Sequence, residues 1–371
     1  MIILGSFFDA LYKEQQTVRM QLLDKFAKSG FNYIGTAINE GNQDFLSKCK
    51  DLGIMVGFQP NGGSDAWIKE TLENNEHIKT VYTYDDANTR GTPDQVKEST
   101  ERFRALMRPD QKTMFSGAWH STASWPNIKD YLGIADIVGL QIYHWRWYWT
   151  RAFFEQCKAA VDLSPTQEFW AYPSNTRNYY GIDTQNFLNQ NPGKTIQDFW
   201  EENHPTLKVQ DYPDIEWMKM YVFSGLIAGI KNFSFYTAYF SDQKRNFFET
   251  TNFMMQPALS RMKELTSIVK KYEDYFDQGV RTITVEEPTK IEAQWVLNGK
   301  TLKMGISNLQ PDPQNSNIAA NMTMIPQVSI TDPDASVVPP TKPVTIVIGE
   351  KQIVIPSQTI IIPEQEITFD I

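Results

Sequence analysis

Two adjacent carboxyl groups, Asp85 and Asp86, directly follow the apolar run Thr80–Tyr84. Two carboxyls this close resist being ionised together, which is one way for a protein to keep a general acid protonated near neutral pH. The plain structural alternative is that one of them caps the following loop while the other is solvated. If Thr80–Tyr84 is a buried strand, a pair of carboxyls just past its end favours acid–base catalysis.

Further polar and aromatic side chains follow other apolar runs in the same way. The candidates for a second carboxyl are Asp9, Glu40 and Asp242. The candidates for ligand contact are Gln59, Trp119, His120, Tyr143, His144, Trp145, Tyr172 and Tyr239. Neither His120 nor His144 has a second histidine or a carboxylate at a metal-ligand spacing, so no metal site is predicted. Both histidines are expected to be hydrogen-bonding residues of a pocket.

Alternating strand and helix patterns would bring these side chains together. The strand-like runs are Ile2–Phe8, Phe31–Ala37, Ile54–Gln59, Thr80–Tyr84, Thr113–Trp119, Ile137–Tyr143, Glu168–Tyr172 and Asn232–Tyr236. Most are apolar on both faces, as buried parallel strands are, and the segments between them carry apolar residues at helical spacing. The alternation predicts an α/β fold, a (β/α)₈ TIM barrel over residues 1–278, in which the carboxyl ends of all strands meet at one mouth.

The sequence changes after the barrel to an alternation of period two. Ile291–Leu297 and Leu302–Ile306 flank Asn298-Gly299, which is a strong hairpin signal, and later apolar runs are separated by Pro and Gly. Residues 279–371 are therefore predicted to form a second, all-β domain with the form of a β-sandwich.

A long polar insertion is predicted at 173–213, rich in Asn, Gln, Pro and Tyr. Structureless segments of this length are uncommon in a compact domain unless they work at a site. The insertion would follow the carboxyl end of the seventh strand, either as a wall of the site or as a peripheral excursion.

The composition narrows the class of partner. A formal net charge of −9 at pH 7 argues against nucleic acid, whose binding draws on clustered Lys and Arg. The two cysteines, Cys49 and Cys157, lie in helical patterns, so a disulfide framework is not expected. No signal peptide and no apolar run long enough to span a membrane is visible, although a chain trimmed of its leader would look the same.

Three segments give the barrel a resemblance to a known superfamily. Tyr82–Asn88 looks like the strand-end motif of clan-A barrel glycoside hydrolases, in which a Tyr-x-x-Asp-Glu-Pro-type segment supplies the acid/base carboxyl. Ala135–Tyr143 resembles the sixth strand of such enzymes, and Phe223–Tyr236 resembles their last helix and eighth strand. A C-terminal β-sandwich is a frequent companion of these barrels.

The resemblance implies a glycoside hydrolase-like protein that acts on a poly- or oligosaccharide without a cofactor. Asp86 would then be the proton donor, Asp85 would orient it, and a second carboxylate would come from Asp9, Glu40 or Asp242. The aromatic run His144–Trp149 would supply rings that stack on the apolar faces of sugars, with core packing as the alternative. The substrate class points to an extracellular or virion surface location.

Two departures from that pattern keep other functions open. Asp86 stands where the superfamily has Glu, and the segment Glu168–Asn175 ends without the expected nucleophilic carboxylate, because Glu168 begins the strand. Hydrolysis needs two carboxyls about 5–5.5 Å apart, or about 6.5–9.5 Å in an inverting enzyme. The alternatives are a non-catalytic carbohydrate-binding or structural protein, such as a virion component that assembles through its C-terminal domain, and a barrel enzyme of another reaction class.

Overall fold

The structure of the protein is a computed structural model. It describes residues 2–8, 20, 23–118, 128–142, 149–173, 189–194, 215–239, 262–271, 273, 281–285, 291–298, 301–308, 344–348, 351–355, 359–361 and 366–368. The first eight strands are β1 Ile3–Phe8, β2 Tyr33–Ile38, β3 Met55–Pro60, β4 Ile78–Tyr84, β5 Lys112–Gly117, β6 Ile137–Ile142, β7 Glu168–Pro173 and β8 Asn232–Tyr239. The helices include α2 Gln43–Asp51, α3 Asp65–Asn74, α4 Ala87–Arg90, α5 Pro93–Arg104, α6 Trp149–Leu163 and α9 Ile215–Ala228.

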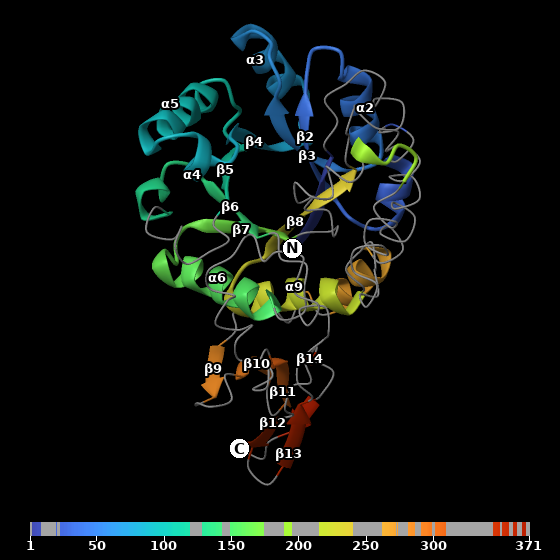
Figure 1. Ribbon diagram of the computed structural model, residues 1–371, viewed down its shortest axis with the longest axis vertical. Helices are drawn as coiled ribbons and strands as arrows, with labels where there is room; N and C mark the ends of the chain where they lie inside the picture. The colour runs from blue at the N-terminus through green and yellow to red at the C-terminus, as the bar shows by residue number, and fades with distance from the viewer. Residues whose placement is uncertain are drawn as a thin grey trace.

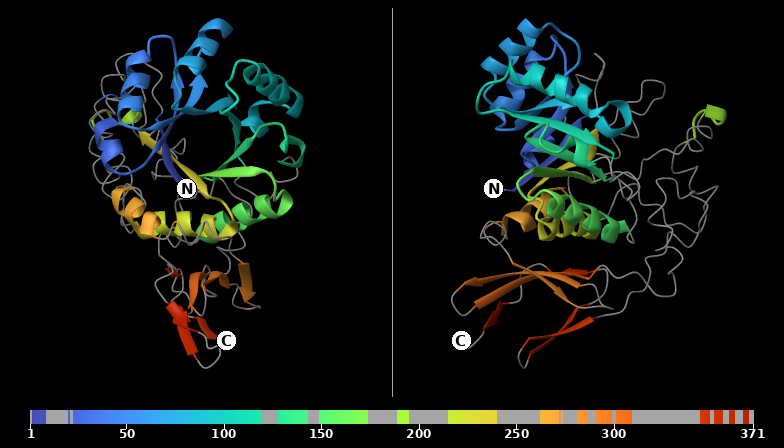
Figure 2. Two further views of the ribbon diagram at one scale, coloured as in Figure 1. Left: turned by 180° about the vertical axis from the view of Figure 1, so that it is seen from behind. Right: turned by 90° about the vertical axis from the view of Figure 1, so that its left-hand side faces the viewer.

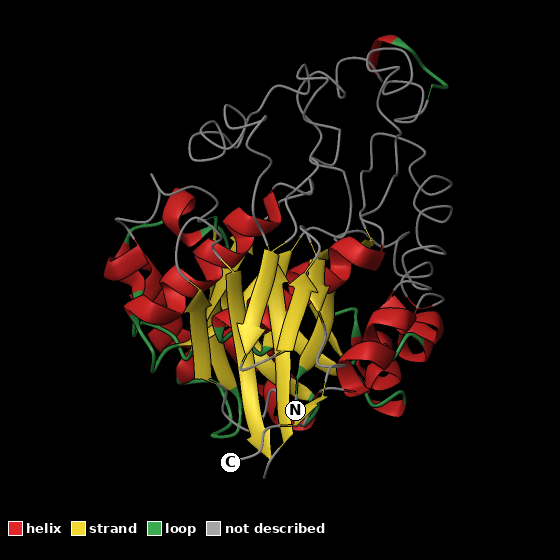
Figure 3. Cartoon of the chain, turned by 90° about the horizontal axis from the view of Figure 1, so that it is seen from below, coloured by secondary structure: helices red, strands yellow, loops and turns green. Residues whose placement is uncertain are grey.

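Strands β1 to β8 pair in chain order and close into a barrel (Figure 1). Every pair around the ring is parallel, including β1 with β8, where Ile3 lies opposite Asn232. The predicted strands and their order are thereby confirmed, with described bounds within two residues of the prediction except at the end of β8, which extends three residues further. The helices surround the strands on the outside of the ring (Figures 1 and 3), which is the arrangement of a TIM-like barrel.

Local sequence signals explain where the outer helices begin and end. Helix α5 starts with a capping box, because Thr92 accepts from the backbone of Gln95 while the Gln95 side chain accepts from the backbone of Thr92. Helix α2 ends before Gly53, which adopts a φ of 68°, a conformation that glycine reaches without steric cost. Such signals set the short connections of the ring.

Two separate cores hold the barrel together. The larger one lies between the strands and the outer helices. The smaller one fills the interior of the ring and consists of Tyr33, Tyr82, Met114, Ile137, Trp170 and Tyr172. Burial raises the pKa of Tyr33 to about 12, so this phenol stays neutral, and its hydroxyl bonds the Thr80 hydroxyl at 2.7 Å. Gly57 makes room for the Tyr33 ring, because any Cβ there would overlap the phenol oxygen.

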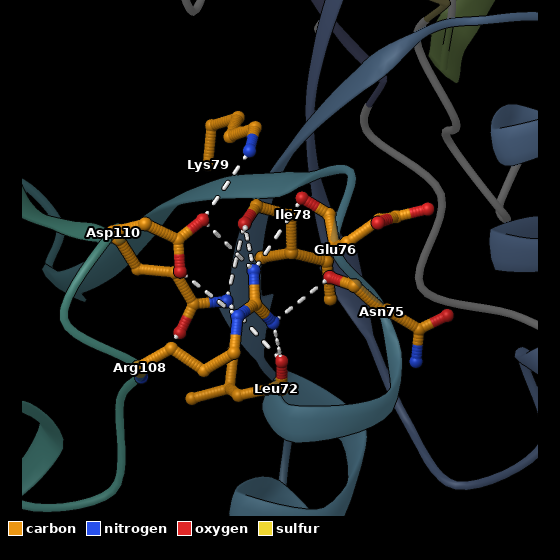
Figure 4. Close-up of polar contacts among 8 residues, drawn as sticks. Leu72, Asn75, Glu76, Ile78, Lys79, Arg108 and Asp110 are labelled. Carbon is orange, nitrogen blue, oxygen red and sulfur yellow. Dashed lines mark hydrogen bonds and ion pairs between the residues drawn. The ribbon is translucent and has the colours of Figure 1, made fainter.

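The N-terminal end of the barrel, where the strands begin, is braced by Arg108. Its guanidinium donates to the carbonyl oxygens of Leu72, Asn75 and Ile78 around the end of α3, and to a carboxylate oxygen of Asp110 at 2.9 Å (Figure 4). The Arg108 side chain is 18% exposed. It therefore ties the carbonyls of the connection between α3 and β4 to the start of β5.

Glu168 braces the same end from inside the ring. Its Oε1 accepts from the indole N–H of Trp170 at 2.8 Å and from the amide of Asn232 at 3.2 Å. Its Oε2 pairs with the ammonium of Lys112. The prediction that Glu168 lies at the start of its strand, away from the mouth, is confirmed.

Seven further strands are described after the barrel. They are β9 Arg281–Val285, β10 Ile291–Asn298, β11 Thr301–Asn308, β12 Val344–Ile348, β13 Lys351–Ile355, β14 Thr359–Ile361 and β15 Glu366–Thr368. β10 and β11 pair antiparallel up to Asn298 opposite Thr301, which confirms the hairpin predicted at Asn298-Gly299. β9, β10, β11, β14 and β15 form one sheet, and β12 and β13 pair separately.

Helix α9 lies against this sheet, in contact with β10, β11 and β14 (Figure 2). The β-sandwich form and the domain boundary after residue 278 stay predictions. The predicted insertion 173–213 lies outside the described residues except for 173 and 189–194. Cys49 and Cys157 are buried and form no disulfide bond. Within the described ranges, no helix combines the length and the apolar character needed to cross a bilayer.

Candidate functional site

The mouth of the barrel, formed by the carboxyl ends of β1 to β8, contains the described part of the predicted site. The described site residues are Glu40, Gln59, Asp85, Asp86, Tyr172 and the backbone of Tyr239. The site residues outside the described ranges are Asp9, Trp119, His120, Tyr143, His144, Trp145 and Asp242. The geometry of the site therefore rests on the doublet and its neighbours.

A β-bulge interrupts β4 just before the doublet. Tyr82 pairs with Met114 of β5. Two residues further along β4, Tyr84 pairs with Phe115, only one residue further along β5. Thr83 is thus the extra residue of the bulge. Bulges change the face to which the following side chains point, and they are frequent next to active sites.

The bulge decides which carboxyl of the doublet faces the interior. Strict alternation from the interior residue Tyr82 would place Tyr84 and Asp86 on the same face. Instead, Tyr84 packs against the outer core, on the same side as the helices. The extra residue shifts the alternation by one, so that Asp85 takes the interior side of the strand end.

Asp85 is held at the mouth by two neutral donors on neighbouring strands. Its Oδ1 accepts from the Ser116 hydroxyl at 2.8 Å and from the Gln141 amide at 3.1 Å. The same amide donates to the Ser116 oxygen at 2.9 Å. Ser116 and Gln141 share the face of the interior residues Met114 and Ile137, two and four positions earlier on their strands. Asp85 therefore lies directly above the packed interior.

Asp85, Ser116 and Gln141 are joined pairwise by hydrogen bonds. The single hydroxyl hydrogen of Ser116 goes to Asp85, and the Gln141 nitrogen donates toward both Asp85 Oδ1 and the Ser116 oxygen, which lie on the same side of the amide. The carboxylate also fixes the orientation of the amide, because a reversed amide would bring its oxygen against Asp85. In the described part of the chain, Oδ2 of Asp85 accepts no hydrogen bond, and no Lys, Arg or His lies within ion-pair distance of it.

Asp86 points elsewhere and serves the following turn. It adopts a φ of 51°, a left-handed conformation that Asp tolerates better than most residues. Its Oδ2 pairs with the guanidinium of Arg90 at 2.8 Å, and its carbonyl accepts from the N–H of Arg90. A carboxyl in such a pair is a poor proton donor, because protonation removes the pair.

Asn88 ties the turn after the doublet to the end of β5. Its side-chain amide donates to the carbonyl of Ala118 at 3.2 Å, and its side-chain oxygen accepts from the N–H of Ala118 at 2.8 Å. The side chain thus pairs with the backbone as a neighbouring strand would. It fixes Ala118, the residue that precedes the predicted ligand contacts Trp119 and His120.

Glu40 and Gln59 lie at the ends of the neighbouring strands β2 and β3. Glu40 is exposed in a turn closed by Asn39 and Asn42, where the N–H of Asn42 donates to the carbonyl of Asn39 at 3.0 Å. Gln59 is half-buried and pairs in register with Ala37. No described contact joins either side chain to Asp85.

Tyr172 belongs to the packed interior. It is 3% exposed, its hydroxyl bonds that of Tyr82, and it donates to the sulfur of Met114 at 3.0 Å. Burial raises its pKa well above the usual value, and the negative charge of Asp85 adds to the rise. In this position the ring forms the floor beneath Asp85 and offers no open face for stacking.

Ser116 and Gln141 were not among the site residues predicted from the sequence. A polar residue between apolar neighbours in a strand, as Gln141 lies between Leu140 and Ile142, is a usable signal for a residue that faces a site. Ser116 carried no such signal beyond its period-two spacing from Met114. The described residues contain no group of three or more His, Cys, Asp or Glu side chains suited to a metal ion.

The sequence matches no protein-family model and no curated protein. Among solved structures, the chain is similar to a GH2 β-galacturonidase from Eisenbergiella tayi at 13% identity and a TM-score of 0.45, covering 72% of this chain and 51% of that one. It is also similar to a Parabacteroides merdae β-glucuronidase at 10% identity and a TM-score of 0.40, covering 64% of this chain and 31% of that one.

A third similar structure is an FMN-binding β-glucuronidase from Facaelibacterium prausnitzii, at 12% identity and a TM-score of 0.44, covering 100% of this chain and 53% of that one. The chain spans between 31% and 53% of the length of these three proteins. Similarities this weak carry no argument about activity. The barrel itself is established by the pairing of its strands.

Proposed function

We propose that the chain is a glycoside hydrolase-like protein that binds a poly- or oligosaccharide at the mouth of the barrel, with Asp85 as its acid/base carboxyl. The observation that carries the proposal is the position of Asp85, above the packed interior and held on one oxygen by Ser116 and Gln141. No described residue bonds the other oxygen, which would accept from a sugar hydroxyl or exchange a proton at a glycosidic bond.

The proposal gives Asp85 the role that the sequence suggested for Asp86. Asp86 is engaged by Arg90 and by the left-handed start of the turn, which suits a structural role. A second carboxylate for hydrolysis would come from Asp9, Glu40 or Asp242. The tryptophans and tyrosines predicted around the mouth, Trp119, Tyr143 and Trp145 among them, would stack on the sugar rings.

One observation favours a second candidate function, binding without cleavage. The described residues of β7 place a carboxylate only at Glu168, at the opposite end of the barrel, and the strand ends at the mouth in Tyr172 and Pro173. A barrel without a nucleophile on this strand could retain the sugar site as a recognition surface. Asp85 would then be a hydrogen-bond acceptor for sugar hydroxyls.

The test compares Asp85→Asn with Asp86→Asn in the full chain. Both proteins and the unmodified chain are screened on a panel of polysaccharides for release of reducing ends, and on a glycan array for binding. We expect Asp85→Asn to lower hydrolysis by at least about 100-fold, the usual contribution of an acid–base group, and Asp86→Asn to lower it far less.

The same screen separates the two candidate functions. Binding that is weakened by Asp85→Asn, without reducing ends from the unmodified chain, would support the recognition function. Full activity or full binding in Asp85→Asn, with its fold intact by circular dichroism, would remove Asp85 from the site and contradict both.

A further inference from the structure

We propose that Gln141 is a specificity-determining residue of the mouth, whose side-chain oxygen accepts a hydrogen bond from a hydroxyl group of the bound sugar. The inference rests on the proposed function of Asp85. It adds to that function a second contact on the ligand, one that distinguishes a sugar with a hydroxyl group at this position from a deoxy sugar.

The orientation of the Gln141 amide follows from its two partners. Its nitrogen lies 3.1 Å from Oδ1 of Asp85 and 2.9 Å from the hydroxyl oxygen of Ser116. Oδ1 already accepts from Ser116, and this bond takes the single hydroxyl hydrogen that Ser116 has. Both partners are therefore acceptors toward Gln141, so the amide presents its nitrogen to them and its oxygen away from them.

The oxygen end of the amide has no partner in the described part of the chain. None of the described residues donates a hydrogen bond to Oε1 of Gln141 or to Oδ2 of Asp85. Gln141 is 5% exposed, and most buried polar atoms in proteins are hydrogen-bonded. A donor from a ligand at the mouth would complete the bonding of this amide.

Gln111 shows how a buried glutamine is bonded where it serves the fold alone. It lies just before β5 at the N-terminal end of the barrel and is 6% exposed. Its nitrogen donates to the carbonyl of Ile78 at 3.1 Å, and its oxygen accepts from the N–H of Arg108 at 2.9 Å. The protein thus satisfies both ends of the Gln111 amide, whereas the described residues satisfy only the nitrogen end of Gln141.

The two open oxygens define the chemistry of the ligand group beside them. Oδ2 of Asp85 and Oε1 of Gln141 are each one carbon atom away from the bonded pair Oδ1 and Nε2, so both lie within reach of one sugar unit. An amide oxygen is an acceptor at any ordinary pH and needs a donor such as a hydroxyl group. A site built to bond a substrate hydroxyl rejects the analogue that lacks it, because the buried acceptor is then left unpaired.

The experiment measures affinity by isothermal titration calorimetry on the full chain. The probes are the glycan of the array that the unmodified chain binds most tightly and a series of its derivatives, each lacking one hydroxyl group. Gln141→Met removes the amide oxygen in a side chain of similar length. Ser116→Ala removes a donor to Asp85 without removing a proposed ligand contact, and Gln111→Met is the matched buried glutamine at the other end of the barrel.

We expect the unmodified chain to bind one of the deoxy derivatives about 10-fold more weakly than the parent glycan, which is the order of loss for one hydrogen bond. Gln141→Met should bind the parent glycan about 10-fold more weakly and should no longer distinguish it from that derivative. Ser116→Ala and Gln111→Met should both keep the 10-fold discrimination.

Two results would overturn the inference and leave the proposed function of Asp85 standing. One is full discrimination against every deoxy derivative in folded Gln141→Met. The other needs no variant and applies even if Gln141→Met does not fold: equal affinity of the unmodified chain for the parent glycan and all of its deoxy derivatives. A chain that binds no glycan would defeat the proposed function and this inference together.

Discussion

The two ends of the barrel treat an inward-facing carboxylate in opposite ways. At the N-terminal end, Glu168 is saturated by the indole of Trp170, the amide of Asn232 and the charge of Lys112. At the mouth, Asp85 is held on a single oxygen by neutral donors, with no cation beside it among the residues that the structure describes. The first carboxylate is engaged on both oxygens by groups that join neighbouring strands, and under the proposed function the second offers an oxygen to a ligand.

This difference indicates that the two ends of the barrel have different roles. In TIM barrels, polar residues at the N-terminal end serve stability, and those at the carboxyl ends of the strands serve function. Substitutions at the N-terminal end should therefore lower the free energy of unfolding, and substitutions at the mouth should alter ligand chemistry with little effect on stability.

The largest loss of stability is expected for Arg108→Ala. The substitution removes the charged donor from the carbonyls of Leu72, Asn75 and Ile78, and charged hydrogen bonds of this kind sum to about 2–4 kcal/mol. Urea denaturation monitored by circular dichroism measures it. Arg104→Ala is the control at a 48% exposed side chain and should cost about 1 kcal/mol or less. Equal losses in the two variants would contradict the bracing role of Arg108.

The next effect in size compares the two carboxylates directly. Glu168→Ala leaves the indole N–H of the buried Trp170 without its partner and should cost about 2 kcal/mol. Asp85→Ala should cost about 1 kcal/mol or less, because Ser116 and Gln141 keep their bond to each other and Asp85 is only half-buried. Urea denaturation of both variants measures the two losses in free energy of unfolding. A larger loss of stability for Asp85→Ala than for Glu168→Ala would contradict the assignment of stability to the N-terminal end and of function to the mouth.

His77, at the N-terminal end of the barrel, is expected to make the free energy of unfolding depend on pH. The residue is 9% exposed just before β4, and both ring nitrogens lack a partner among the described residues. Burial lowers its pKa below 6.5, and the nearby charge of Lys50 lowers it further. A histidine whose pKa is lowered by folding binds protons more readily in the unfolded chain. The contribution of His77 to stability is therefore fully present above pH 6.5 and declines as the pH falls through and below that value.

The substitution His77→Phe removes this pH-dependent contribution to stability. Unfolding by urea at pH 7.5 and at pH 5.5 should show a smaller decline for the variant than for the unmodified chain, by at most about 1 kcal/mol after allowance for solvent screening. An identical decline in both proteins would show that His77 does not titrate against folding.

The smallest effect is expected for Asp86→Asn. Its ion pair joins side chains that are 23% exposed for Asp86 and 65% exposed for Arg90, and exposed pairs contribute about 0–1 kcal/mol. Asn also tolerates the left-handed backbone of this position. Thermal unfolding should therefore shift little. A loss as large as that of Glu168→Ala would mean that the turn after β4 carries more of the stability than its exposure suggests.

The sequence predicted the barrel well because each strand is an apolar run between helix signals. Phe31–Ala37 and Glu168–Tyr172 differ from the observed strands by one or two residues at their ends. The placement of Glu168 also followed from the sequence, since a residue at the start of a parallel strand lies at the N-terminal end of the barrel.

The orientation of the doublet could not be predicted. Period-two alternation is counted from an unbroken strand, and one extra residue at Thr83 inverts it without any mark in the composition. The burial of Tyr172 could not be predicted for a related reason. A ring packed inside the barrel and a ring exposed at its mouth lie on the same side of a strand and differ only in their position along the barrel axis. Ser116 needed the neighbouring strand register to be recognised.

The most direct test is a crystal structure of the full chain with an oligosaccharide chosen from the glycan panel. The account predicts a sugar oxygen within about 2.6–3.2 Å of Oδ2 of Asp85, with Ser116 and Gln141 still donating to Oδ1 and Arg90 still paired with Asp86. A sugar bound against Asp86, or bound away from the mouth with Asp85 untouched, would contradict it.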